Sequence, residues 1–291
     1  MIDLPAEVKI TPKTYLPIVF SLLLSWVLTI LSSESGLIYP RPVITPAEEP
    51  SPMTPPSEAL TSPAPYLNTF LIIGLITFSG LVMLYLARKR LKLFRILVGS
   101  LIWLLSFGVT VFIFITFAFV LGFWIFRFWI PVSVAAASII AYLMLSSRGL
   151  ASSLAASYLA AGAGAAIGMG IPYWTFFILT VGISIYDILA VYKGHLSTLT
   201  KEDASTLRGL TVEVGDLIIG LGDLFFYSLT LSAIQRYLGF IPAIPAFISL
   251  LIGYTITILA LRKHRILPGL PIPLLLALGS ALLTSLLLSL A

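Results

Sequence analysis

Two aspartates lie inside long apolar segments of this sequence, where an acidic side chain is costly. Asp187 lies within the segment 184–191, and Asp223 lies within the segment 219–228. A charge at the centre of a membrane helix costs roughly 2.5–3.5 kcal/mol on insertion scales, so each residue is a candidate functional group. Two carboxylates within reach of each other cannot both ionise cheaply, and such a pair shares one proton. The ionised group can then take a proton from water while the protonated group polarises a peptide carbonyl. These two residues therefore predict acid–base hydrolysis.

The same two acids also fit a membrane transporter. Buried aspartates serve as proton relays or cation sites in transporters, and Glu213 and Asp216 could extend an acidic path away from Asp223. A purely structural role, with each carboxylate hydrogen-bonded to Ser or Tyr, is a third reading. The spacing of the charges does not by itself decide between hydrolase and transporter.

The composition indicates a helical membrane protein. The chain has 291 residues, of which 10% are charged, and its mean hydropathy is +1.07. A soluble protein has about 25% charged residues. The absence of cysteine excludes disulfides, thiol catalysis and thiolate metal sites. The two histidines, His195 and His264, lie in separate loops without further ligands nearby, so neither a metal nor a cofactor is expected. The net charge of +5 comes from basic residues in short loops and does not indicate nucleic-acid binding.

The apolar runs predict an all-α, polytopic membrane protein with nine transmembrane helices. The expected spans are residues 16–31, 66–87, 96–118, 130–145, 149–169, 172–192, 213–234, 241–261 and 270–290. The first run also fits a signal peptide, but it is long for one, and we interpret it as a span. Nine of the prolines fall in 32–66, which predicts an extended or disordered external linker. We divide the chain into an N-terminal part, 1–212, and a C-terminal part, 213–291.

The basic residues predict the orientation of the chain. With nine spans and a cytoplasmic N-terminus, 14 of the 17 Lys and Arg residues fall on the inner side. Such an asymmetry is typical of a multi-pass protein whose N-terminus is inside, and it places the C-terminus outside. Asp187 then lies roughly 9 Å and Asp223 roughly 10 Å from the inner boundary, at 1.5 Å per residue. The two acids are therefore expected at matching depth, and Gly220 and Gly222 would let the helix of Asp223 approach a neighbour closely.

Three short sequence motifs resemble motifs of the presenilin family of intramembrane aspartyl proteases. Tyr186-Asp187 resembles the YD motif of that family, and Gly220-Leu221-Gly222-Asp223, continued by Phe226-Tyr227-Ser228, resembles its GxGD segment. Pro268-Gly269-Leu270 stands where the family has Pro-Ala-Leu, before the ninth span. The middle residue departs from the family pattern. The chain is thus similar to a compact, microbial (archaeal-type) member of the family.

The resemblance implies a function and a set of site residues. It implies an intramembrane aspartic endopeptidase in which Asp187 and Asp223 are catalytic, supported by Tyr186, Gly220, Leu221, Gly222, Pro268, Gly269 and Leu270. The expected partners are transmembrane helices of single-span, type I-like substrates and the lipid bilayer. No accessory subunit is evident, and a homo-oligomer is compatible with the sequence. The resemblance also implies that a substrate segment pairs as a strand near the loop before the seventh span, where 205–214 permit a short strand. Because the family has Ala at the position of Gly269, we expect Gly269→Ala to keep activity and Gly269→Leu to block substrate access.

Overall fold

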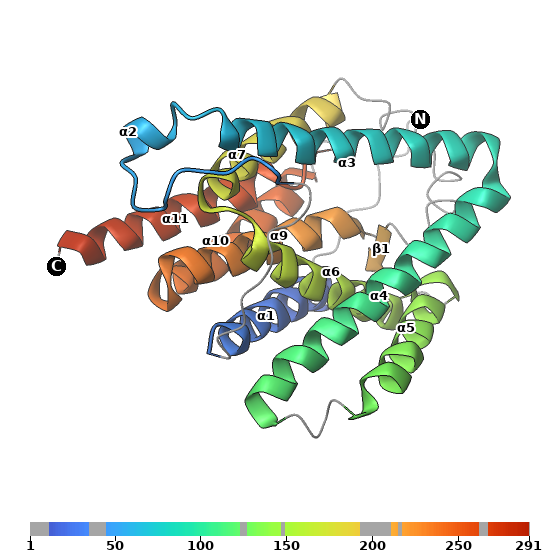
Figure 1. Cartoon of the computed structure of the whole chain (residues 1–291). Coiled ribbons are helices and arrows are strands. Elements are labelled where there is room, and N and C mark those ends of the chain that lie inside the picture. Colours follow the sequence, from blue (N-terminus) through green and yellow to red (C-terminus); the bar gives the residue numbers. More distant parts are fainter. Residues whose placement is uncertain are drawn as a thin grey trace.

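The computed structural model describes residues 12–34, 45–122, 127–146, 149–192, 211–214, 217–261 and 267–290. Within them the chain forms helices and one β-hairpin (Figure 1). The elements are α1 (Pro12–Glu34), α2 (Pro56–Ala59), α3 (Ala64–Lys89), α4 (Leu91–Leu121), α5 (Trp129–Ser146), α6 (Leu150–Gly170), α7 (Tyr173–Tyr192), β1 (Thr211–Val214), β2 (Leu217–Gly220), α9 (Leu221–Leu238), α10 (Phe240–Leu261) and α11 (Pro271–Leu290). The two histidines and most of the segment 205–214 lie outside these residues.

The prediction of a polytopic, all-α membrane protein is confirmed. Eight helices of the described chain are long and apolar enough to cross a membrane, namely α1, α3, α4, α5, α6, α7, α10 and α11. The helix α9, which carries Asp223, is not among them, so the count of nine spans stays a prediction. Its side chains from Leu224 to Ile234 are buried, apart from the half-buried Phe225. Because α9 is surrounded by other helices rather than by lipid, it can carry Ser228, Thr230 and Ser232 on buried positions.

The predicted start of the helix that carries Asp223 is wrong by eight residues. The sequence predicted a helix from residue 213, but the structure has a β-hairpin there and α9 begins at Leu221. Strands β1 and β2 pair antiparallel, with Val212 opposite Ile219 and Thr211 opposite Gly220. β-Branched residues favour such pleated structure over helix. Asp223 therefore lies in the first turn of α9, not almost three turns inside a helix that starts at residue 213.

The basic segment 88–95 is also more helical than predicted. The sequence suggested a loop, but α3 continues to Lys89 and α4 starts at Leu91. Only Arg90, with φ −142° and ψ 59°, departs from helical geometry. The helix α3 lies along one side of the bundle in Figure 1, and most of its side chains are exposed. This exposure suits contact with lipid rather than with water, because the exposed residues include Leu67, Phe70 and Phe78.

Small residues of α6 allow it to lie against the backbone of α9. A Cβ atom at Gly164 would lie 2.8 Å from the Leu229 nitrogen, and one at Gly168 would lie 2.6 Å from the Leu229 oxygen. Such close contact drives helix association in a membrane, where apolar side chains gain little by leaving lipid. The glycines of α6 therefore have a packing role. Gly222, by contrast, has no atom within 4 Å of an added Cβ, so it makes no close approach.

Part of the proline-rich linker is docked on the bundle rather than free. Asn68 of α3 accepts a hydrogen bond from the Ala47 nitrogen and donates one to the Ala47 oxygen, each 3.0 Å long. Glu49 then accepts hydrogen bonds from the backbone nitrogens of Trp174 at 2.8 Å and Thr175 at 2.9 Å. These amides belong to the first turn of α7. Backbone N–H groups in the first turn of a helix have no hydrogen-bond partner inside the helix. A carboxylate is favoured at this position by the helix dipole, so Glu49 caps α7 at the end opposite Asp187.

Candidate active site

The site begins with Asp223 at the N-terminus of α9. Gly220 is the N-cap residue of this helix, so Asp223 is its third residue. The carboxylate interacts with the backbone of Gly220, and a Cβ added at Gly220 would lie only 3.5 Å from Oδ2 of Asp223. An acidic group at the third position commonly reaches back to the N-cap amide, and the helix dipole favours its charge. The hairpin that ends at Gly220 thus fixes where this carboxylate lies.

Asp187 comes from α7, in the second-last turn of that helix. Its side chain is half-buried, and Oδ2 accepts a hydrogen bond from the backbone nitrogen of Leu270 at 2.9 Å. The carboxylate of Asp187 also interacts electrostatically with that of Asp223. The helices α7 and α9 therefore bring the two predicted acids into one site.

The segment before α11 lies between the two carboxylates. Leu270, which is 5% exposed, donates its N–H to Asp187, whereas its neighbour Gly269 faces Asp223. A Cβ added at Gly269 would lie 2.7 Å from Oδ2 and 3.0 Å from Cγ of Asp223. The predicted site residues Gly269 and Leu270 thus contact both aspartates. Pro268 precedes them, half-exposed, and Pro271 begins α11, a position where its missing N–H costs nothing.

The other predicted site residues lie around this centre with less direct roles. Tyr186 and Leu221 are half-buried and pack against the core. Gly222 is exposed. The support that these three residues were predicted to give the site stays a prediction. Among the residues that the structure describes, no three His, Cys, Asp or Glu side chains gather in a way that could hold a metal.

Two tyrosines that the sequence analysis did not assign to the site also lie there. The hydroxyl of Tyr227 donates a hydrogen bond to the carbonyl oxygen of Gly269 at 2.7 Å. Tyr254 of α10 is 5% exposed, and its hydroxyl interacts electrostatically with Asp223. Tyr227 could have been found from the sequence, because it follows Asp223 by four residues and so shares its helix face. Tyr254 lies 31 residues after Asp223, and no local pattern connects it with either acid.

The described fold is that of presenilin-type intramembrane aspartate proteases. Two structures of a presenilin family intramembrane aspartate protease, in C222 and P2 space groups, superpose on the chain with TM-scores of 0.62 and 0.64. They share 18% and 19% sequence identity with it, cover 97% and 98% of this chain, and are themselves covered completely. No protein-family model matches the chain.

A curated relative adds similarity at the level of sequence. The chain is 35% identical over 113 residues to Presenilin-B of Dictyostelium discoideum. The match covers 35% of this chain and 24% of the length of that protein. The resemblance to the presenilin family that the motifs predicted is thus confirmed.

Proposed function

We propose that this chain is an intramembrane aspartic endopeptidase of the GxGD type, with Asp187 and Asp223 as its catalytic pair. The observation that supports this most is the site itself, in which two acids from different helices face one short backbone segment. Soluble aspartic proteases use a carboxylate pair of this kind, sharing one proton. The relatives that share this fold are described as presenilin family intramembrane aspartate proteases.

The reaction follows from the shared proton. The ionised carboxylate takes a proton from water as the water oxygen attacks the carbonyl carbon of the scissile peptide bond. The protonated carboxylic acid gives its proton to the carbonyl oxygen, which produces a neutral tetrahedral diol. The carboxylic acid then gives its proton to the peptide nitrogen while the ionised carboxylate takes a proton from one hydroxyl of the diol, and the C–N bond breaks to give a carboxylic acid and an amine. The carboxylates end with one shared proton again, so no metal or cofactor is required for the balance.

The substrates that we propose are transmembrane helices of single-span, type I-like membrane proteins. A helix hides its peptide bonds in hydrogen bonds, so a substrate must unwind before Asp187 and Asp223 can reach it. The hairpin supports this proposal, because β2 ends at Gly220, three residues before Asp223. Within the described chain the sheet has two strands, β1 and β2. An unwound substrate segment can add to such a sheet as a further strand, which would hold its backbone extended beside the acids.

We further propose that the N-terminus is cytoplasmic and the C-terminus external. The 14 basic residues predicted on one side support this orientation. It places the site near the cytoplasmic face, because Asp187 and the hairpin lie toward the end of α7 that precedes the segment 193–210.

The test is a cleavage assay in liposomes with a single-span type I substrate. Purified wild-type protein should cut it, whereas Asp187→Asn and Asp223→Asn should each abolish cleavage while the protein keeps its fold. Asn retains the size of Asp but cannot ionise, so loss of activity without loss of thermal stability isolates the proton chemistry. Near-normal cleavage by Asp223→Asn would contradict the proposed pair.

The transporter alternative predicts a different result with the same samples. If the acids form a proton or cation site, wild-type liposomes should show flux that depends on both aspartates and no cleaved product. Aspartic-protease transition-state analogues should then fail to bind. A protease should bind them and cut substrate without any ion gradient.

A further inference from the structure

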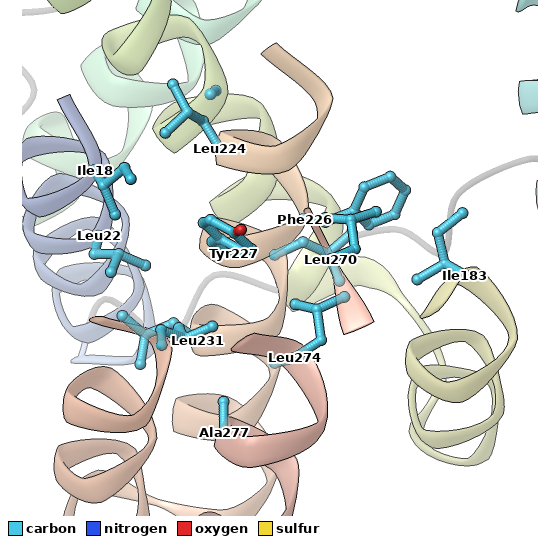
Figure 2. Packing of buried hydrophobic residues seen from close by; sticks show 14 of the residues in the cluster. Ile18, Leu22, Ile183, Leu224, Phe226, Tyr227, Leu231, Leu270, Leu274 and Ala277 are labelled. Carbon is cyan, nitrogen blue, oxygen red and sulfur yellow. The ribbon is translucent and has the colours of Figure 1, made fainter. Parts of the chain in front are cut away.

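Tyr227 is among the largest side chains that are fully buried in the bundle, with 1% exposure. In Figure 2 its ring lies between Ile18 and Leu22 of α1 on one side and Leu270 and Leu274 on the other. An aromatic ring buried so completely usually finds a partner for its polar atom. For Tyr227 that partner is the Gly269 carbonyl oxygen, 2.7 Å away. The ring thus packs in the core while its hydroxyl is directed at the segment between the two aspartates.

The Gly269 carbonyl and the Leu270 N–H belong to one peptide group. The carbonyl accepts the Tyr227 hydroxyl, and the N–H donates to Oδ2 of Asp187 at 2.9 Å. A peptide group is planar, so fixing the direction of its carbonyl also fixes the direction of its N–H. Hydrogen bonds in such a chain also polarise one another, which strengthens the N–H as a donor. The hydroxyl of Tyr227 therefore reaches Asp187 through a single peptide bond.

The same contact connects the helices of the two acids. Tyr227 lies one turn after Asp223 on α9, so both side chains move with that helix. The peptide that Tyr227 holds contacts Asp187 of α7, and Gly269 at its start faces Asp223. Among the described residues, Tyr227 is the side chain that donates a hydrogen bond to the Gly269 carbonyl oxygen. The position of one carboxylate relative to the other would then rest on packing alone.

We propose that Tyr227 is a positioning residue of the aspartate pair, acting on Asp187 through the peptide group of Gly269 and Leu270. The inference rests on the proposed function, because it assigns a role within that same site. It predicts that removal of one hydroxyl, with the ring retained, slows the chemical step and leaves substrate binding unchanged. A misplacement of about 1 Å in a catalytic group can cost on the order of a hundredfold in rate. A loosened peptide should move Asp187 by less, and we expect kcat to fall about tenfold.

The test compares Tyr227→Phe with Tyr237→Phe in the liposome cleavage assay. Tyr237 is a matched control, because it lies on the same helix and its hydroxyl also donates to a backbone carbonyl, that of Ile171. The hydrogen bond of Tyr237 lies at the C-terminal end of α9, whereas Asp223 lies at the N-terminal end. Both variants keep the ring and lose a hydroxyl that donates to a backbone carbonyl. Tyr227→Phe should lower kcat about tenfold with KM within twofold of wild type, and Tyr237→Phe should leave both constants near wild type.

A second measurement separates positioning from loss of stability. Thermal unfolding of Tyr227→Phe and Tyr237→Phe in the same detergent shows whether the two hydroxyls stabilise the fold equally.

The outcomes distinguish this inference from the proposed function. If wild-type protein cleaves and Asp223→Asn does not, but Tyr227→Phe has the wild-type kcat, the positioning role is refuted and the protease stands. An equal fall of kcat in Tyr237→Phe and Tyr227→Phe would also refute it. If wild-type protein does not cleave at all, the proposed function itself fails.

Discussion

The substitution Gly269→Ala gives opposite predictions from the sequence and from the structure. The motif comparison predicts retained activity, because Ala is the residue that the presenilin family has at this place. The structure predicts interference, because a Cβ at Gly269 would lie 2.7 Å from Oδ2 and 3.3 Å from Oδ1 of Asp223. An ordinary contact of a Cβ atom begins at about 3.4 Å. The Asp223 carboxylate would therefore have to move by about 0.7 Å, the difference between the two distances.

That displacement sets the expected loss. Because a misplacement of about 1 Å can cost on the order of a hundredfold, a shift of this size should lower kcat about tenfold, or about 1.4 kcal/mol in the barrier. The free energy of unfolding of Gly269→Ala should not fall together with kcat. The described glycines with positive φ are Gly122, Gly149 and Gly239, and Gly269 is not one of them. Alanine at a compatible φ stabilises by about 0.4–1 kcal/mol through the unfolded chain, so the melting temperature should be unchanged or higher.

The assay measures kcat, KM and thermal unfolding for Gly269→Ala beside Gly279→Ala. Gly279 lies on α11, and an added Cβ there meets no atom within 4 Å. The control therefore carries the same chemical change on the following helix without the contact to Asp223. A wild-type kcat for Gly269→Ala would refute the structural reasoning and favour the motif comparison. The bulkier Gly269→Leu should lose more activity than Gly269→Ala, since its side chain must also displace neighbours of the acids.

Two further predictions concern the opposite end of the bundle and the orientation of the chain. Glu49→Ala should lower the free energy of unfolding by about 2 kcal/mol, because two amides of α7 lose a charged acceptor. The same change at the exposed Glu48 should have little effect, and equal melting temperatures of the two variants would mean that the cap contributes nothing. Leu91→Cys, in a chain without cysteine, should react with a membrane-impermeant maleimide only from the cytoplasmic side. Labelling from the outside alone would overturn the proposed orientation.

The sequence alone was sufficient for the class of fold and for the identity of the candidate acids. Long apolar runs with basic residues between them predict membrane helices because both signals are local, and the described helices α5, α6, α7 and α10 begin and end within two residues of the predictions. Asp187 and Asp223 could be recognised because an acid in an apolar run is costly wherever the run lies in the fold. The short motifs around them then predicted the resemblance to presenilins.

The tertiary structure decided how those residues meet. The sequence predicts a helix from residue 213, but cross-strand pairing of β1 with β2 prevails and moves the start of α9 to Leu221. The cap that Glu49 provides for α7 joins residues 125 positions apart, a distance over which no periodicity acts. The same holds for Tyr227 and Gly269, which lie 42 positions apart. Local patterns report what each segment prefers, whereas contacts between distant segments exist only after the helices have packed.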